Sequence, residues 1–487
     1  MAIAYPPGEK DAGPDASPRE TAAASGPGIL TGVLNGPAAH KVRELVGGIL
    51  GGDNDNHKAR RTALLAFGVR VISAAILYLS QILLARWLGT FEYGIFAFTW
   101  AVVLIVAGMA SLGFSLSVAR FIPEYLARNE DSLLRGLLLS SRTIPVLVST
   151  LCALSGAALV LGLDGVVEDY YVVPLILAFI CFPVYTLIDI QDGIARANNW
   201  INLALIPPYI LRPLLVLVFM VVAVLSGAPA NAEMALYCSI GAIWLTAMTQ
   251  WLFLRGRLKK LVTPGERTFR TGFWVKVSMP IFLVDSFFLF MTNTDILVLS
   301  HYGSPEDVGI YFAAVKTLAL ISFVSFAVAA ASAHKFSEYY AKGEHTKLEA
   351  FVRDSIVWTF WPSLAGTILI VALGKPALWL FGEGFQAAYP VMFIVAFGLL
   401  CRAAVGPLER LLNVTGKQNL CAAVYFIAFI MNLSFNLLLI PVYGIIGAAI
   451  ATSMAYVVES ILLAIVVQRK LGLRVMIWHR RPAQGGT

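Results

Sequence analysis

The chain has 487 residues, of which 58% are hydrophobic and 13% are charged, and its net charge is +7. Soluble domains carry about 25% charged residues, so this composition excludes an ordinary soluble protein. Apolar runs long enough to cross a bilayer, which takes about 20 residues per helix, recur along the sequence and predict an all-α polytopic membrane protein. The basic residues cluster in alternate loops, as in membrane topology, so we expect no nucleic-acid partner.

The first 60 residues differ in composition from the rest. Residues 1–28 are rich in Pro, Gly, Ala and Asp and contain too few apolar side chains to form a core. No early basic stretch precedes an apolar core, so we expect no cleaved signal peptide. Residues 29–51 could form a weak interfacial helix. The interpretation that we favour is a largely disordered cytoplasmic tail over residues 1–60.

Apolar spans of about 20–28 residues, enough to cross a bilayer with some tilt, follow this tail. They predict about twelve transmembrane helices, at residues 62–87, 94–117, 136–162, 171–190, 201–226, 232–254, 273–299, 308–331, 355–374, 387–406, 418–440 and 443–467.

Lys and Arg decide the orientation of these spans. They concentrate in the connections after residues 117, 254 and 331 and after residue 467, whereas the opposite side has one clear basic residue, Lys375, among acidic ones. Since cytoplasmic loops carry the excess of Lys and Arg, both termini are expected in the cytoplasm. The basic linker 255–272 then separates an N-terminal six-helix lobe (61–254) from a C-terminal one (273–468), with a cytoplasmic tail at 469–487.

Two stretches of the chain repeat each other. GTFEYGIF around Gly89 corresponds to GSPEDVGIY around Gly303, and EYLARNE from Glu124 corresponds to EYYAKGE from Glu338, 214 residues later. A repeat in the same order and spacing predicts a duplicated architecture. Because each half has an even number of spans, the two lobes should be parallel repeats around a central cavity, as in transporters whose substrate site lies between two halves.

The repeated motifs have structural interpretations. Gly89 and Gly303 permit tight reversals, and Glu92 and Glu306 could cap the next helix. The Glu124-Tyr125 and Glu338-Tyr339 pairs lie at the cytoplasmic mouth. We interpret them as anchors of helix ends, with a gate salt bridge as the alternative.

Three cations lie deep in the predicted spans. A charge at mid-helix costs about 2.5–3.5 kcal/mol on insertion scales and normally faces protein or water. Arg70 shares a helical face with Ser73 and Gln81. Arg212 is flanked by prolines that kink its helix, and Lys316 lies in the span 308–331. We expect Arg70, Arg212 and Lys316 to line an electropositive cavity that binds a phosphate-bearing substrate.

Arg142 and Lys276 lie near the cytoplasmic ends of their spans. They could join the same cavity, but we favour side chains that snorkel to the interface. Asp285 is the single acid among these positions, and the first half shows no mid-span acid. Asp285 is therefore a candidate for ion coupling or for the polar lining of the cavity.

Polar residues also recur late in the chain. Gln418, Tyr425, Asn432 and Asn436 follow helical spacing, which interhelical hydrogen bonds explain without a ligand. Asn432 and Asn436, together with Gln81, are candidates for polar lining. Glu459, in the span 443–467, either couples transport to a proton or cation or pairs with a basic neighbour.

Several chemistries have no motif in this sequence. It contains no G-x-x-x-x-G-K-[ST] loop for ATP hydrolysis and no H-E-x-x-H or other metal-ligand cluster. The external loops are too short to form a catalytic domain. We therefore expect no catalytic residue, no metal and no cofactor.

The chain resembles a known family along roughly residues 60–470. LLARWLGTFEYGIFAFTWAVVLIVAGMASLGFSLSVARFIPEYLA (83–127) looks like the first two helices of Wzx-type polysaccharide flippases. TNTDILVLSHYGSPEDVGIYFAAVKTL (292–318) resembles the matching region of their second half, and NLLLIPVYGIIGAAIATSMAYVVES (436–460) is similar to their turn between spans eleven and twelve. These flippases belong to the multidrug/oligosaccharidyl-lipid/polysaccharide exporter superfamily.

The resemblance implies a V-shaped bundle of two lobes whose cavity opens alternately to each side. It implies a flippase that moves an oligosaccharide repeat unit on polyprenyl pyrophosphate across a bacterial inner membrane, for exopolysaccharide, capsule or O-antigen synthesis. A cationic cavity suits this anionic substrate, since an unpaired anion in low dielectric is costly. Partners would be the lipid-linked oligosaccharide and, among assembly proteins, a polysaccharide polymerase.

Two alternatives stay open. One is a cation-coupled multidrug exporter of the same superfamily, which would need an acidic cavity. The other is a membrane polysaccharide polymerase or ligase, which would need a large external loop.

Overall fold

The computed structural model describes residues 55–162, 165 and 167–473, without the side chains of residues 55–67 and of Arg70. The predicted tails at 1–54 and 474–487 lie outside the described residues. Helix α3 begins at Asp55, five residues before the predicted end of the N-terminal tail at residue 60.

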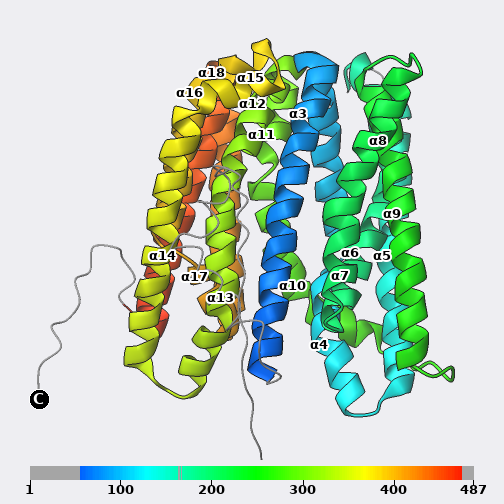
Figure 1. The fold of residues 1–487 in the computed structure, drawn as a ribbon, viewed down its shortest axis with the longest axis vertical. Coiled ribbons are helices and arrows are strands. Elements are labelled where there is room, and N and C mark those ends of the chain that lie inside the picture. The colour runs from blue at the N-terminus through cyan, green and yellow to red at the C-terminus, as the bar shows by residue number, and fades with distance from the viewer. Residues whose placement is uncertain (1–54, 163–164, 166, 474–487) are drawn as a thin grey trace, which may run out of the picture. The chain divides into compact units, whose positions relative to one another are not determined.

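The described residues are almost entirely helical (Figure 1). In chain order the elements are α3 (Asp55–Ala110), α4 (Phe114–Ala127), α5 (Asp131–Gly162), α6 (Asp169–Ala197), α7 (Ile201–Ile206), η1 (Pro207–Leu211), α8 (Arg212–Leu225), α9 (Ala232–Leu261), α10 (Thr271–Met291), α11 (Thr294–Tyr302), α12 (Pro305–Leu318), η2 (Ala319–Ile321), α13 (Ser322–Ala341), α14 (His345–Ala372), α15 (Gly374–Phe381), η3 (Glu383–Ala388), α16 (Tyr389–Ala403), α17 (Leu408–Val414) and α18 (Gln418–Leu471).

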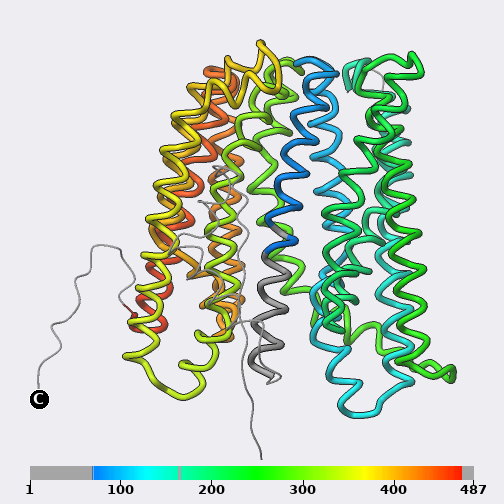
Figure 2. Tube along the Cα trace, viewed as in Figure 1, coloured from blue at the N-terminus to red at the C-terminus, as the bar shows by residue number. Residues whose placement is uncertain are grey.

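Ten helices in the described part of the chain are long and apolar enough to cross a membrane. Two of them, Val71–Ala127 and Gln418–Leu471, are far too long for one crossing. Each contains a glycine with positive φ, Gly89 at 74° and Gly444 at 54°, where the helix reverses. Both therefore cross twice, and Figure 2 follows α3 through its reversal. The ten helices give the twelve passes that the sequence predicts.

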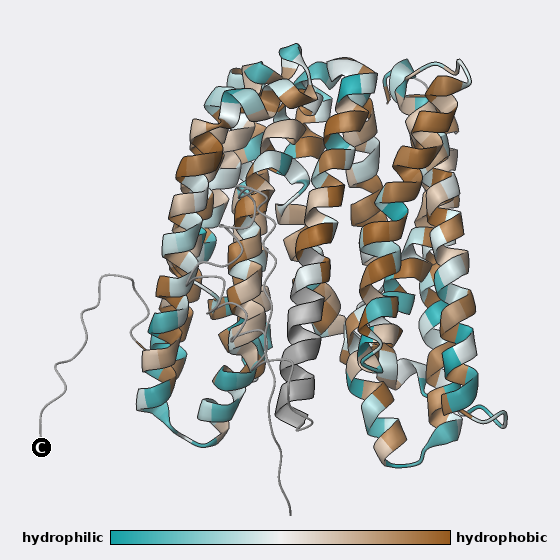
Figure 3. Ribbon diagram, in the orientation of Figure 1, coloured by the Kyte–Doolittle hydropathy of each residue, from teal (hydrophilic) through white to brown (hydrophobic). Residues whose placement is uncertain are grey.

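The connections between passes define two ends of the bundle. The turn end carries Gly89, Gly303 and Gly444, and the basic end carries the connections 128–130, 262–270 and 342–344. Between the ends, large apolar side chains such as Leu151 (63% exposed) and Leu438 (68%) face outward. Figure 3 shows apolar residues along the helices and more hydrophilic ones toward both ends. This is the surface that a bilayer requires.

The apolar cores differ between the two ends. One cluster at the turn end combines residues of both halves, such as Leu84 and Leu299. At the basic end one cluster, around Phe121 and Leu258 of the first half, also contains Trp274 of α10, and the second half has another around Phe336 and Leu411. The halves thus share a core at the turn end. The basic end has two distinct cores, and α10 of the second half joins the first of them, where Trp274 donates a hydrogen bond to Tyr125.

The repeated turn motifs contact each other across the two halves. An added methyl group on Gly94 would lie 1.7 Å from the carbonyl oxygen of Pro305, and one on Gly309 would lie 2.4 Å from that of Thr90. Gly94 and Gly309 are equivalent positions of the repeat, 215 residues apart, as are Thr90 and Pro305. The duplication therefore creates a two-fold-like crossing in which glycine lets the backbones touch.

Replacing Gly94 with alanine should lower the free energy of unfolding by about 1–3 kcal/mol, because the new methyl group overlaps a backbone oxygen that cannot move aside freely. Chemical unfolding in detergent measures this change. Gly256→Ala is the matched control, since nothing lies within 4 Å of its added methyl group. Equal stability of the two variants would refute the close crossing.

The two Glu-Tyr motifs end their helices in the same way. The amide of Glu130 donates to the carbonyl of Tyr125 (2.9 Å), and the amide of Glu344 donates to that of Tyr339 (3.0 Å). In both turns the preceding residue, Asn129 or Gly343, has positive φ, which is typical of a helix C-cap. The repeat thus specifies the same chain reversal in each half.

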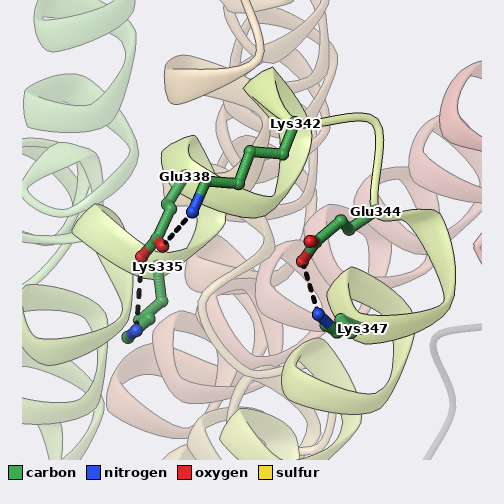
Figure 4. Close-up of polar contacts among 5 residues, drawn as sticks. All are labelled: Lys335, Glu338, Lys342, Glu344 and Lys347. Carbon is green, nitrogen blue, oxygen red and sulfur yellow. Dashed lines mark hydrogen bonds and ion pairs between the residues drawn. The ribbon is translucent and has the colours of Figure 1, made fainter.

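The acidic residues of these motifs form ion pairs within their own helices. Glu124 contacts Arg128 at 3.1 Å, and Glu338 contacts Lys335 at 3.2 Å and Lys342 at 2.8 Å (Figure 4). The carboxylate of Glu338 accepts a hydrogen bond from Lys342 and raises the pKa of its ammonium group. These contacts anchor the helix ends. None of the described ion pairs of the two glutamates joins one half of the chain to the other.

The described caps in the turn motifs differ from those predicted at Glu92 and Glu306. Glu92 accepts a hydrogen bond from the amide of Ala232, at the start of α9, and so caps a distant helix. In the second copy Ser304 and Asp307 form the capping box of α12, and Gly303 has ordinary backbone angles (φ −113°). The second turn therefore depends on capping and needs no positive φ.

Candidate functional site

A cavity of about 340 Å³ lies where three segments meet, namely α3, the η1–α8 segment and the α12–α13 segment. Arg212, Lys316 and Gln81 all line this cavity. Two cations and one polar side chain that the sequence predicts to line a cavity thus line the same cavity in the structure. No acidic residue is among the described residues that line it. Ser73, Tyr78 and Tyr209 supply hydroxyl groups, and Leu77, Leu320 and Phe323 supply apolar surface.

Prolines place Arg212 at this cavity. Pro208 and Pro213 lack the amide donors of a regular helix, and residues 207–211 widen into a π-turn in which the amide of Arg212 donates to the carbonyl of Pro207. Such turns often occur at functional sites. The guanidinium of Arg212 lies over the rings of Tyr185 (5.0 Å) and Trp100 (5.6 Å). This cation–π packing holds a charge inside the helix bundle.

Lys316 reaches the cavity from the other half. It lies in the last turn of α12, where the helix dipole favours a cation. Its ammonium nitrogen is 4.5 Å from the ring centre of Phe312. Nearby, Tyr93 donates a hydrogen bond to Gln81 (3.0 Å). The lining side chains are thus held by ring and hydrogen-bond contacts.

A second cavity of about 350 Å³ adjoins the first. Both are lined by Ser322 and Phe326. The charged residues that line the second cavity are Asp285, Arg402, Glu409, Arg410 and Glu459. This mixture of signs corrects the expected uniformly electropositive cavity, since positive charge without acids occurs only in the first of the two.

Glu459 pairs with a basic neighbour. Its carboxylate lies 3.2 Å from Nε of Arg402, and its side chain is 1% exposed. The guanidinium of Arg402 also lies over the rings of Phe288 (5.4 Å) and Tyr456 (5.5 Å). Of the two interpretations of Glu459, the geometry shows the ion pair.

The other predicted cations lie elsewhere. The side chain of Arg70 is outside the described residues. Arg142 lines a separate pocket at the basic end of the first half. Lys276 lines a third space with Asn419 and Pro280. Neither Arg142 nor Lys276 lines the cavity of Arg212, and the alternative that they join it finds no support there.

The described hydrogen bond between Asn432 and Asn436 lies within α18 and is not the interhelical bond that the sequence predicts. Asn436 donates to the side-chain oxygen of Asn432 (3.0 Å), and both residues are fully buried, as is Tyr425 at 1% exposure. Gln418 is exposed at the start of the helix. Asn432 and Asn436 thus lie in the helix core and outside both cavities.

Asp285 is the single acid among the six charged positions predicted in the spans, but the helices contain further acids, and the expectation that the first half shows no mid-span acid is wrong. Asp295, which lies inside the predicted span 273–299, is 2% exposed and accepts hydrogen bonds from Tyr311 (2.5 Å) and Thr452 (3.2 Å). Helix α6 continues to Ala197 and contains Asp189 and a buried Asp192. Counting acids against the span boundaries would have found Asp295 and Asp189.

Comparisons with known proteins place this geometry among transporters. Residues 60–334 match the polysaccharide biosynthesis protein family, and residues 280–438 match the MatE family. The chain is 25% identical over 406 residues to a probable low-salt glycan biosynthesis flippase of Haloferax volcanii, covering 82% of each chain.

Solved structures share the fold at low identity. One is the lipid II flippase MurJ in an inward closed conformation (TM-score 0.65, 17% identity, 83% of this chain and 87% of that one). Another is an inward-facing multidrug resistance MATE family transporter (TM-score 0.66, 14% identity, 83% and 98%). These likenesses confirm the predicted all-α, multi-pass membrane fold and leave the substrate open.

Proposed function

Because the chain belongs to the polysaccharide biosynthesis protein family, as the resemblance predicted, we propose that it is a flippase for a polyprenyl-pyrophosphate-linked oligosaccharide unit. The observation that carries this proposal is the cavity of Arg212 and Lys316, which contains two cations and no acid among its described lining residues. The relative in Haloferax volcanii, whose name describes a glycan biosynthesis flippase, supports the same substrate class.

The chemistry of the cavity suits the headgroup of such a lipid. A pyrophosphate that leaves water needs paired cations, because an unpaired anion in low dielectric is costly. The fork of Arg212 and the point charge of Lys316 can share its oxygens. The hydroxyl groups of Tyr78 and Tyr209 suit sugars, and Phe323 and Leu320 suit the first isoprene units. A volume of about 340 Å³ is near the lower end of the range of small-molecule sites, so it suits the pyrophosphate headgroup and its nearest neighbours and not the whole lipid-linked unit.

The arrangement of the cores supports alternating access. The shared core and the Gly94–Gly309 crossing close the turn end, whereas the basic end has two distinct cores, the first of which includes Trp274 of α10. If the basic end is cytoplasmic, as the distribution of Lys and Arg indicates, the substrate enters from the cytoplasm. Release on the other side then requires the glycine crossing to separate. In this proposal both termini lie in the cytoplasm of a bacterium and the protein spans its inner membrane.

A multidrug exporter is the second candidate. The match of residues 280–438 to the MatE family and the acids of the second cavity, Asp285 and Glu409, favour it. Both acids share that cavity with Arg402 and Arg410, so a cationic drug would meet opposing charges. The polymerase or ligase alternative is disfavoured, since the similar proteins named above are flippases and transporters.

Deleting the gene in its own organism should abolish the surface polysaccharide and leave its lipid-linked unit on the cytoplasmic leaflet, because in this proposal the flippase carries the charged pyrophosphate across the bilayer. Immunoblots of the polymer and protection of the lipid-linked unit from an external glycosidase measure this. Re-expression of the wild-type chain should restore both. Normal polymer output together with increased drug sensitivity would instead support the exporter.

A further inference from the structure

A second set of cations lies apart from the proposed transport cavity. A pocket of about 510 Å³ at the basic end is formed by α5, α9 and the connection 262–267. We call it the basic pocket. It has no lining residue in common with the cavity of Arg212. Its charged lining residues are all cationic, namely Arg135, Arg142, Arg255, Lys259 and Arg267.

Arg142 is the residue that points to a ligand. Its Nε and one terminal nitrogen are buried and have no hydrogen-bond partner among the residues that the structure describes. A buried charged donor without an acceptor is strongly unfavourable. An anion in the basic pocket would supply the missing acceptor. Arg142 thus has a role beyond the snorkelling that its position in the sequence suggested.

The wall of the basic pocket is fixed by Arg135. Its guanidinium donates to the carbonyls of Glu266 and Thr263, both at 2.7 Å, and an added methyl group on Gly265 would lie 2.9 Å from it. The nearby carboxylate of Asp131 lies 4.0 Å from Arg135 and accepts a hydrogen bond from Thr263. The carboxylate of Asp131 is therefore bound to the wall of the pocket. The four cations other than Arg135 remain as possible contacts for a ligand.

The surface beside the basic pocket is apolar. Leu139, which lines the pocket, is 36% exposed, and Met248, one turn before Trp251 on the same face of α9, is 52% exposed. Trp251 itself packs its ring 5.0 Å from the guanidinium of Arg255. Tryptophan beside cations at a helix end is typical of the membrane interface. A ligand here would contact acyl-chain surface and cations at the same time.

We propose that the basic pocket binds the phosphate headgroup of an anionic phospholipid from the leaflet at the basic end. The phosphate would accept hydrogen bonds from Arg142 and from the exposed Arg255 and Lys259, and the acyl chains of the lipid would lie along Leu139 and Met248. Soluble phosphate has the same headgroup chemistry but no acyl chain that could contact the apolar side chains beside the pocket. The site does not depend on the transported substrate.

Lipid retention by the full-length protein tests this proposal. The purified protein is exchanged into nanodiscs that contain phosphatidylglycerol and phosphatidylcholine, and the bound lipid is measured by native mass spectrometry. The wild type should retain phosphatidylglycerol preferentially, and Arg142→Gln should lose about tenfold in that affinity, as expected for one lost charge-assisted contact. The double variant Arg255→Gln/Lys259→Gln is altered only at exposed positions and should show the same loss. It therefore tests the site even where Arg142→Gln does not fold.

Arg257→Gln is the matched control. Arg257 lies in the same helix, α9, is exposed, and packs over Trp200 outside the basic pocket. It should retain phosphatidylglycerol like the wild type. Equal retention by all variants would overturn the site. Displacement of phosphatidylglycerol by millimolar inorganic phosphate would overturn the lipid assignment in favour of a soluble anion.

Discussion

Replacing Arg402 with glutamine is expected to lower the free energy of unfolding by about 3–5 kcal/mol, because it leaves the carboxylate of Glu459 buried without its cation. Glu459 is 1% exposed and lies 3.2 Å from Arg402. Removing the carboxylate instead should cost less. Arg402 is 27% exposed at the second cavity and keeps its contacts with the rings of Phe288 and Tyr456.

A double-mutant cycle in detergent measures this coupling by chemical unfolding. Arg402→Gln, Glu459→Gln and the double variant are compared with Arg410→Gln, which removes an exposed cation from the same cavity. The double variant should recover part of the stability that Arg402→Gln loses, since it contains no unpaired charge. If Arg402→Gln is as stable as Arg410→Gln, the ion pair has no structural role.

Replacing both Arg212 and Lys316 with glutamine is expected to reduce transport at least about tenfold, while the protein still folds. Each charge-assisted hydrogen bond to a phosphate contributes about 1.5–3 kcal/mol, and glutamine can replace the hydrogen bond without the charge. Both side chains line the cavity, and neither forms a described ion pair that the substitution would break. The loss should therefore appear in transport more than in stability.

Much of the fold could be predicted from the sequence. Apolar length gives the number of passes, and the duplicated motifs predict matching turns because each half repeats the same chemistry at Tyr125 and Tyr339. Deep cations are informative for a related reason. A charged side chain inside the membrane must face protein or a water-filled cavity. Arg212 and Lys316 therefore could be predicted to line a cavity, and they line the same one although they lie in different halves.

Contacts between distant segments could not be predicted. The pairing of Glu459 with Arg402, the crossing of Gly94 with Gly309 and the unpaired guanidinium of Arg142 each depend on which helix faces which. Hydrophobic pattern and charge give the depth of a residue in the membrane but not its neighbours. Asp295 could not be predicted to be buried for a different reason. It lies near the end of a predicted span, where acids are usually exposed to water, yet the structure buries it.

The most direct test of the cationic cavity is translocation by the purified protein. Liposomes that contain a short-chain polyprenyl-pyrophosphate oligosaccharide are made with the wild type, with Arg212→Gln/Lys316→Gln, or with Lys276→Gln, whose side chain lines a different space. Access of an external glycosidase to the sugar reports the rate. We expect the wild type and Lys276→Gln to translocate at similar rates and the double variant to be at least about tenfold slower. Equal rates for all three proteins would contradict this expectation.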